Sequence, residues 1–237
     1  MRPRGAGGAR FVPRLPLIPL FSLPLPPFRS TDTKEGLETN FATNTLAVFA
    51  LTEALLPVLR RSSPSRVVVV SSGGQYTEAL SLTDMQWKSG SGFSGARQYA
   101  RDKRRQTALT ERWGRDPANA GVFFASCHPG WADTDAVRTS LPQFYESLKP
   151  KLRTPEQGAD TPTWLAIAPL PKLTTAVPAG TLANGAFWFD RRRVSTHLTS
   201  GGTSYPNEVV DTLHKNLEDL VAATLKAAAP AAAAAKA

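Results

Sequence analysis

Apolar residues recur at helical spacing between positions 30 and 61. The residues that set this spacing are Leu37, Phe41, Leu55 and Leu59, at multiples or near-multiples of the helical period. Asp32 and Thr33 are available as N-terminal caps, and Pro64 lies beyond the end. The pattern predicts one long helix, straight or bent.

Two apolar runs follow, with the composition of strands. "RVVVVSSGG" at 66–74 is stopped by a glycine pair, and "GVFFASCHPG" at 121–130 is closed by a turn. Continuous β-branched and aromatic runs of this kind are typical of strands buried on both faces of a parallel sheet. The segment between them has a helical pattern that begins near Ser94 and ends near Gly114 or Pro117.

A further helix and a further strand are predicted beyond position 150. Thr154 is placed as an N-cap, with Pro155 at the first helical position and Gln157 three residues after the cap. Pro162 is expected to disturb the interior of this helix. "GAFWF" at 185–189 has the pattern of a third strand. Because strands alternate with helices, the sequence predicts an α/β fold with parallel strands and a site at their carboxyl ends.

Composition divides the chain into three parts. Residues 1–30 contain five arginines, seven prolines and no acidic residue, which predicts an irregular Pro/Arg-rich leader. Residues 221–237 form a low-complexity, alanine-rich tail that cannot build a core. The predicted helices and strands, and therefore the chemistry, lie in residues 31–220.

Cysteine content, charge and hydropathy limit the compartment and the partners. Cys127 is the only cysteine, which excludes an internal disulfide and a cysteine-based zinc site and favours a reducing compartment such as the cytoplasm. The Arg-rich leader also has features of an organelle transit peptide, so a mitochondrion or plastid is the alternative. No uninterrupted apolar stretch reaches the roughly 20 residues of a membrane span, so we expect no transmembrane segment. The net charge of +9 favours an anionic ligand or partner.

Two serines and a tyrosine–lysine pair form the candidate active site. Ser71 and Ser72 end the first predicted strand, and because adjacent strand residues face opposite sides, only one of them can face a given site. Tyr99 and Lys103 share one face of the following helix. A cation beside a phenol favours the phenolate and lowers the pKa of the tyrosine, and a serine hydroxyl can hydrogen-bond a substrate oxygen. The pattern predicts a site that polarises a carbonyl group.

Spacing alone does not identify this pair. Tyr145 and Lys149 have the same spacing, but they follow no serine-ended strand and run into Pro150. The basic run at 101–106 could also form a solvated helix face or a nucleic-acid patch. It lacks interleaved aromatic residues for base stacking, so we expect no nucleic-acid partner.

The segments resemble the short-chain dehydrogenase/reductase family. "VVVVSSGG", "YARDK" and "HPGWADT" are similar to its catalytic-serine strand, its Tyr-x-x-x-Lys helix and its Pro-Gly turn, and "NFATNTLAVFALTEALLPVL" to its asparagine-bearing helix. The finer pattern resembles the branch called dehydrogenase/reductase family member twelve. The resemblance implies a Rossmann-like, doubly wound parallel sheet. It also implies hydride transfer between NAD or NADP and a small-molecule alcohol or carbonyl substrate.

The resemblance further implies a role for each matching residue. Asn44 would organise a proton-relay water at a helix bend, and Ser72, with Ser71 as the alternative, would orient the substrate carbonyl. Tyr99 would be the general acid or base, and Lys103 would bind the nicotinamide ribose and lower the tyrosine pKa. Three residues after the second strand would line the nicotinamide: Pro129, Gly130 and Thr134.

The N-terminal unit of the family has no counterpart in this sequence. The family begins with a strand and a glycine-rich turn whose backbone amides hold the pyrophosphate. "GAGGAR" at 5–10 has the wrong glycine spacing and no preceding strand. We therefore expect an incomplete sheet that lacks the N-terminal strands, leaves the edge of the 66–70 strand open and favours self-association. The alternative hypotheses are a non-catalytic, truncated interaction module and a basic nucleic-acid binder.

Overall fold

The computed structural model describes residues 30–62, 64–89, 92–174, 184–198 and 201–234. The predicted leader, 1–30, lies outside these residues except for its last position. The helices are α1 (Thr39–Phe41), α2 (Ala47–Arg61), α3 (Gly95–Arg115), α4 (Asp135–Ser140), α5 (Pro142–Leu148), α6 (Pro155–Ile167), α7 (Leu170–Thr174) and α8 (Asn207–Ala234). Short π or 3-10 segments are η1 (Ala42–Leu46), η2 (Gly73–Tyr76), η3 (Pro117–Asn119) and η4 (Lys149–Lys151). The strands are β1 (Ser65–Val70), β2 (Val122–His128), β3 (Phe187–Phe189) and β4 (Arg192–Val194).

The strands form one sheet in the order β1-β2-β3-β4. β1 pairs with β2 and β2 with β3 in parallel, while β4 returns antiparallel to β3. The turn between β3 and β4 holds Asp190 and Arg191 at positive φ angles of 48° and 57°. The α/β fold and the three parallel strands are therefore confirmed, and the sheet is open. The β3–β4 hairpin was not predicted.

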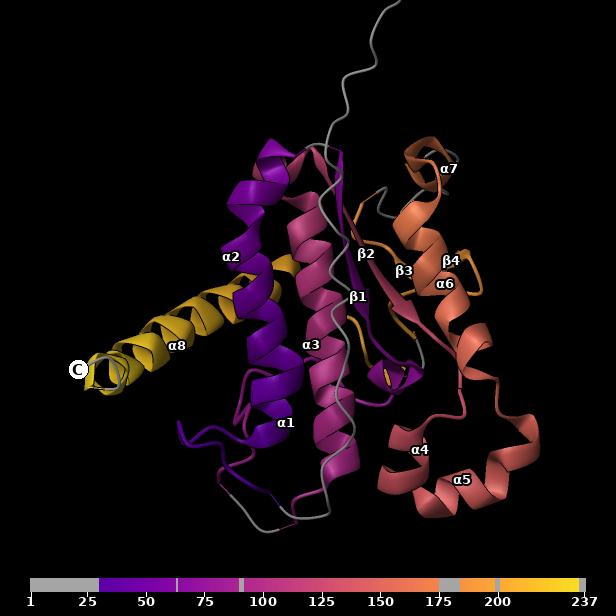
Figure 1. Ribbon diagram of the computed structural model, residues 1–237, viewed down its shortest axis with the longest axis horizontal. Helices are drawn as coiled ribbons and strands as arrows, with labels where there is room; N and C mark the ends of the chain where they lie inside the picture. The colour runs from indigo at the N-terminus through magenta and orange to yellow at the C-terminus, as the bar shows by residue number, and fades with distance from the viewer. Residues whose placement is uncertain (1–29, 63, 90–91, 175–183, 199–200, 235–237) are drawn as a thin grey trace, which may run out of the picture.

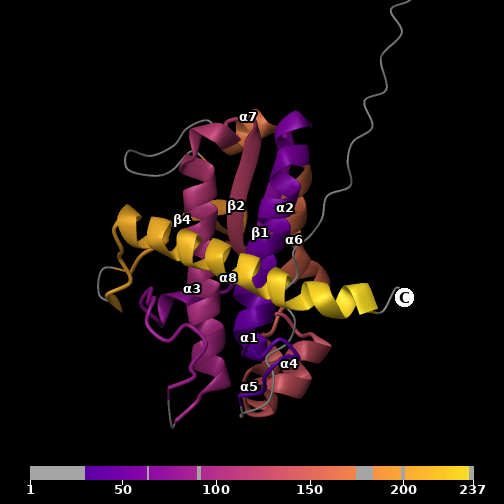
Figure 2. The ribbon, with the colours of Figure 1, turned by 90° about the vertical axis from the view of Figure 1, so that its left-hand side faces the viewer.

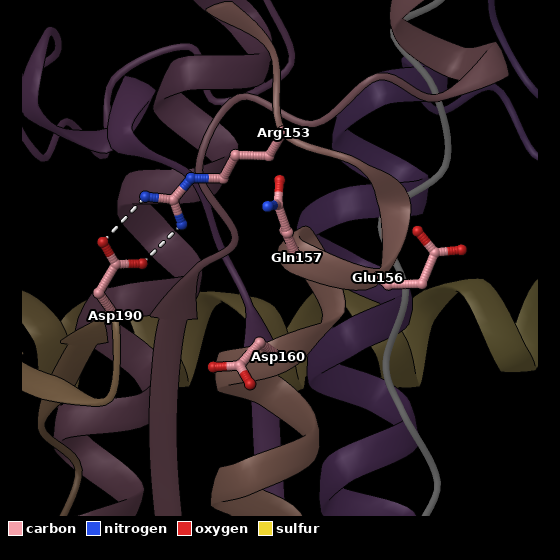
Figure 3. Close-up of a pocket in the computed structure, with 5 residues that line it drawn as sticks. All are labelled: Arg153, Glu156, Gln157, Asp160 and Asp190. Atoms are coloured by element: carbon pink, nitrogen blue, oxygen red, sulfur yellow. Dashed lines mark hydrogen bonds and ion pairs between the residues drawn. The ribbon is translucent and has the colours of Figure 1, made fainter.

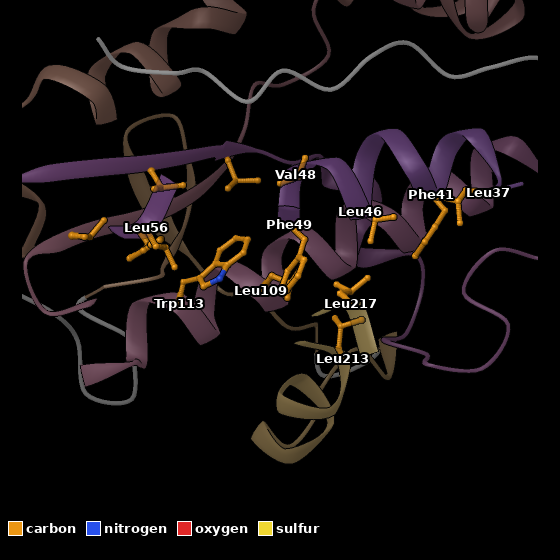
Figure 4. Packing of buried hydrophobic residues seen from close by; sticks show 14 residues of the cluster. Leu37, Phe41, Leu46, Val48, Phe49, Leu56, Leu109, Trp113, Leu213 and Leu217 are labelled. Atoms are coloured by element: carbon orange, nitrogen blue, oxygen red, sulfur yellow. The ribbon is translucent and has the colours of Figure 1, made fainter. Parts of the chain in front are cut away.

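Helices cover both faces of the sheet, with α2 and α3 on one side and α6 on the other (Figure 1). Alternate strand residues therefore enter two cores. Val67, Val69 and Phe124 pack with Phe49 and Trp113 beneath α2 and α3 (Figure 4). The opposite core holds the intervening strand residues with the side chains of α6 and α7, namely Val68, Phe123, Ala125, Cys127, Leu165 and Leu173. This burial on both faces explains why the strands lack polar alternation.

The long N-terminal helix is bent by a π segment. Helical backbone runs from Thr39 to Arg61, with η1 between α1 and α2. Its N-cap is Glu38, whose carboxylate accepts the Asn40 and Phe41 N–H groups at 3.0 and 2.8 Å, so the predicted caps Asp32 and Thr33 are wrong. A side chain two positions from the first helical N–H groups satisfies them better than residues a full turn earlier.

Helix α6 has the predicted N-terminus. The hydroxyl of Thr154 accepts the Gln157 N–H, and the Gln157 amide oxygen accepts the Thr154 N–H, which completes a capping box. Pro162 lies within the helix without ending it. α6 therefore continues to Ile167 against the sheet.

Thr39–Arg61 is 23 residues long and apolar enough to span a membrane by length and composition, the one such helix in the described part of the chain. One face of this helix belongs to the protein core, where Phe41, Leu46 and Phe49 are buried. Helix α8 crosses the outer face of α2 and α3 (Figure 2). Leu213 and Leu217 of α8 complete the same core.

The basic run of α3 is buried rather than solvated. Lys103, Arg104 and Arg105 are each 1% exposed or less. Arg105 pairs at 2.9 Å with Asp102, which also accepts a 2.7 Å hydrogen bond from Thr45. Arg104 donates to backbone carbonyls of the 196–203 segment and lies over the ring of Tyr205. The interpretation of this run as a nucleic-acid patch or a solvated face is therefore wrong, because three of its cations face inward.

We expect Arg105→Met to destabilise the fold by about 3–5 kcal/mol, because it leaves the Asp102 carboxylate buried without its cation. Arg97→Met is the matched control on the same helix, since the Arg97 side chain is 59% exposed and its ion pair with Glu78 lies at the surface. Urea unfolding followed by circular dichroism measures both. Equal losses in the two variants would contradict the buried pair, whereas Asp102→Asn added to Arg105→Met should recover part of the loss.

Candidate active site

The two adjacent serines at the end of β1 face different surroundings. Ser71 is 2% exposed, and its hydroxyl donates to the Lys103 carbonyl oxygen at 2.9 Å and contacts the Thr107 hydroxyl at 3.2 Å. Ser72 caps η2, and its Oγ accepts the Gly74 N–H at 3.1 Å. The Ser72 hydroxyl is also near enough to the Tyr99 phenol to lower the pKa of the phenol. Ser71 thus holds α3 to the strand, and Ser72 is the hydroxyl at the candidate site.

Tyr99 and Lys103 lie on the same face of α3, next to the end of β1. The Lys103 Nζ is 5.1 Å from the centroid of the Tyr99 ring. It donates to the Val70 carbonyl oxygen at 3.0 Å and to the Gln106 Oε1 at 3.2 Å. Two of its three N–H groups are therefore engaged, and the side chain is fully buried.

Burial controls the ionisation of both groups. It raises the pKa of Tyr99 to about 12, which the nearby Asp102 also favours and the Ser72 hydrogen bond opposes. It lowers the pKa of Lys103 to about 7, against the opposing effect of Asp102. Desolvation thus disfavours both charged forms. That Lys103 lowers the tyrosine pKa stays a prediction of the resemblance, since the causes of the Tyr99 shift do not include Lys103.

Asn44 occupies the π segment and reaches Lys103 through a residue that the sequence analysis missed. The Asn44 carbonyl oxygen accepts a 2.6 Å hydrogen bond from the Gln106 Nε2, and the Gln106 Oε1 accepts from Lys103. The Asn44 side chain itself donates to the Asn40 carbonyl oxygen at 3.1 Å. A side-chain amide thus connects the Asn44 backbone carbonyl to Lys103.

The segment after β2 carries the three residues expected to line a nicotinamide. Gly130 has a φ of +82°, and a Cβ atom there would come within 2.6 Å of the Arg153 Nε. Thr134 caps α4 by accepting the Val137 N–H at 3.3 Å. Backbone hydrogen bonds of 2.8 Å tie Arg153 to Trp131 and Asp133 on either side of this turn. Pro129, Gly130 and Thr134 therefore lie in one braced loop at the carboxyl end of β2.

Arg153 is held by a bidentate ion pair with Asp190, at 2.6 and 2.8 Å (Figure 3). This pair borders an exposed hollow of about 540 Å³ that Glu156, Gln157 and Asp160 complete. Arg153 also lines a second hollow, of about 640 Å³. Gly73, Gly74, His128 and Gly130 belong to its wall, so it is at the carboxyl ends of β1 and β2.

The second tyrosine–lysine pair has none of these surroundings. Lys149 lies 5.5 Å from the ring centroid of Tyr145, at the end of α5, and its side chain is exposed. Nothing in the described residues joins this pair to a serine or to a strand end. The order of elements, rather than the spacing, therefore separates the two pairs.

The residues present fit the nicotinamide end of a dinucleotide in part. Gly130 borders the larger hollow, and the Arg153 side chain already fills the place that a Cβ atom at Gly130 would take. The Lys103 side chain is not accessible to solvent, so contact with a ribose would require the residues that bury it to move. Of Pro129, Gly130 and Thr134, only Gly130 borders the larger hollow in the present geometry.

Comparison with known proteins identifies similar chains. Dehydrogenase/reductase SDR family member 12 from Bos taurus is 45% identical over 188 residues, which cover 79% of this chain and 56% of the bovine protein. The Homo sapiens protein of the same name is 42% identical over the same shares. Human retinol dehydrogenase 13 is 29% identical over 57% of this chain and 43% of its own. The chain therefore spans just over half the length of the first two relatives. No protein-family profile matches it.

A solved structure supports the fold. A protein from Mycobacterium paratuberculosis, described as uncharacterized, superimposes with a TM-score of 0.51 over 84% of this chain and 63% of its own, at 20% identity. The serine-ended strand, the Tyr99–Lys103 helix and the Pro-Gly turn occur in this fold in the order that the sequence resemblance implied. The chain belongs to the short-chain dehydrogenase/reductase family.

Proposed function

We propose that the chain carries the proton-transfer site of an NAD(P)-dependent oxidoreductase that acts on a small-molecule alcohol or carbonyl compound. The observation that carries the proposal is the position of Tyr99, with the Lys103 Nζ 5.1 Å from its ring centroid and the Ser72 hydroxyl near enough to lower the pKa of its phenol. A nicotinamide cofactor, when bound, supplies or accepts the hydride. The relatives named as dehydrogenases and reductases support the same reaction class.

Ser72 and Tyr99 divide the work on the substrate oxygen. The Ser72 hydroxyl donates a hydrogen bond that positions and polarises a carbonyl. Because its pKa is about 12, Tyr99 keeps its proton at neutral pH and can give it to the alkoxide that forms as a carbonyl is reduced. The reverse reaction needs the phenolate, which burial disfavours. At neutral pH the free site is therefore in the protonation state that carbonyl reduction requires.

Lys103 supplies a positive charge near Tyr99, and Gln106 keeps that charge in position. With a pKa near 7, Lys103 is partly protonated at neutral pH, and its ammonium form stabilises the phenolate that remains after proton transfer. Gln106 and the Val70 carbonyl fix the position of Nζ. Asn44 acts through its backbone carbonyl, which anchors Gln106.

A non-catalytic role is the second candidate, and the burial of Lys103 favours it. An amine that is fully covered cannot contact a ribose without rearrangement. The same cluster of buried polar groups would then serve only to hold α3 against β1. Affinity for a dinucleotide separates the two candidates.

We expect Tyr99→Phe to lower carbonyl reduction by at least about 10²–10⁴-fold, because the proton donor is lost while the ring stays. Cofactor affinity should change only a few-fold. Steady-state kinetics with this chain, and with a chimera in which residues 31–220 replace the matching segment of the bovine relative, measure both. Tyr145→Phe is the matched control and should leave turnover unchanged. Rates like those of the unmodified protein in Tyr99→Phe would exclude the assigned role.

Lys103→Ala should lower both turnover and dinucleotide affinity, because the residue is assigned to the tyrosine and to the ribose. Fluorescence titration with NADH and NADPH gives the affinity, and thermal unfolding shows whether the fold persists. Lys103→Met preserves most of the buried volume, and Lys149→Ala is the control in the second pair. A loss of turnover with unchanged dinucleotide affinity would remove the ribose contact and leave only the electrostatic role.

Self-association remains a prediction from the sequence. β1 is the end strand in the order of the sheet, and its valines are β-branched and apolar. Such a strand pairs readily with another copy of the chain unless other residues cover it. Size-exclusion chromatography with light scattering is expected to show dimers or larger species, and a monomer at all concentrations would contradict this expectation.

A further inference from the structure

The larger hollow, of about 640 Å³, has aromatic walls. Tyr76, Trp131 and Phe189 line it from three separate segments, following β1, following β2 and ending β3. The Tyr76 hydroxyl already has a partner, because it donates to the Ser195 carbonyl oxygen. Trp131 is 54% exposed and packs edge-on against Phe144 at 5.5 Å. A flat apolar group fits such a surface.

His128 adds one hydrogen-bond donor to this wall. Its Nδ1 is 3.0 Å from the Gly73 backbone nitrogen, and because a backbone N–H can only donate, Nδ1 is the acceptor. The proton of the neutral ring is therefore on Nε2, which has no hydrogen-bond partner within the described residues. Burial, reinforced by the Arg153 charge, lowers the pKa of His128 to about 4, so this tautomer persists at neutral pH. The ring itself is fixed by stacking on Phe189 at 5.1 Å.

The charged residues of the hollow are cationic. Lys151 and Arg153 line it, and none of its lining residues is acidic. Arg153 lies 4.9 Å from the Phe189 ring centroid and is partly neutralised by Asp190. Lys151 is exposed and forms no ion pair with the described part of the chain. An anionic group in the hollow would therefore meet one uncompensated ammonium and one imidazole N–H.

We propose that this hollow binds an aromatic or similarly flat apolar carboxylate, with the acid group between Lys151 and His128. The inference rests on the proposed function for one point, that such a ligand is the substrate. Ser72 and Tyr99 do not themselves line the hollow, but Gly74 does, and its N–H donates to the Ser72 Oγ at 3.1 Å, so the hollow adjoins the candidate site. The substrate class is then a carbonyl or alcohol compound that also carries an acidic group.

Binding of 2-naphthoate to the full chain, followed by tryptophan fluorescence and calorimetry, tests the site without any turnover. The neutral 2-naphthamide has the same ring and lacks the charge. We expect the acid to bind about ten-fold more tightly than the amide, as for a hydrogen bond to a charged group. Equal affinities would overturn the proposal.

Two variants locate the acid group. Lys151→Met should weaken naphthoate binding about three-fold, because the ammonium is exposed, and leave naphthamide binding unchanged. Lys149→Met is the matched control, since Lys149 belongs to the same short η4 segment but does not line the hollow. His128→Phe preserves the stacked ring and should weaken the acid about ten-fold. Similar effects of the two lysine variants would overturn the assignment.

Two further measurements separate this site from the reaction and from other anions. Naphthoate binding should persist in Tyr99→Phe. The binding site can therefore be confirmed or rejected even if the proposed catalytic function is wrong. Inorganic pyrophosphate should compete only weakly. If pyrophosphate binds more tightly than naphthoate and displaces it, the hollow accepts phosphate groups instead, and the proposal is wrong.

Discussion

The burial of charged side chains along α3 is the constraint on which the rest of the structure depends. Asp102, Lys103, Arg104 and Arg105 are all inside the protein, where an unpaired charge is strongly unfavourable. Each therefore has specific partners: Arg105 and Thr45 for Asp102, Val70 and Gln106 for Lys103, and the 196–203 backbone for Arg104. These contacts join α3 to the N-terminal helix, to β1 and to the C-terminal segment. The path of the chain around α3 follows from satisfying these charges.

The same burial sets the chemistry of the candidate site. A lysine near a tyrosine lowers the phenol pKa only while it is charged, and desolvation here lowers the pKa of Lys103 to about 7. Burial of the phenol itself raises the pKa of Tyr99 to about 12, so the tyrosine keeps its proton at neutral pH. In this protonation state, Tyr99 can donate a proton but cannot accept one. Any ligand that brings positive charge or water to the Tyr99 ring would shift the balance toward the phenolate.

The sequence predicted the parts of the structure that local pattern controls. The runs ending in Ser72 and Pro129 became strands because their residues are apolar on both faces, and the helix starting at Thr154 has its capping box. The patterns missed features that depend on one side chain or on unusual backbone angles, and also contacts between distant positions. The cap of the first helix is Glu38, which binds the helical N–H groups through its side-chain carboxylate. The β3–β4 hairpin needs positive φ angles at Asp190 and Arg191, where the sequence has no glycine to indicate a turn. The arginines looked solvated because their partners are far away in sequence.

Gln106 is a residue of the candidate site that the helical spacing in the sequence could have predicted. Tyr99, Lys103 and Gln106 are at positions i, i+4 and i+7, which follow one face of a helix through two turns. Extending the Tyr–Lys spacing by one more turn reaches a residue that can both donate and accept, beside a lysine that needs an acceptor. Asp102 and Arg105, three residues apart, follow an adjacent face in the same way. The helical period thus contained both the reactive face and the face that binds the N-terminal helix. Only the burial of the second face required the three-dimensional structure.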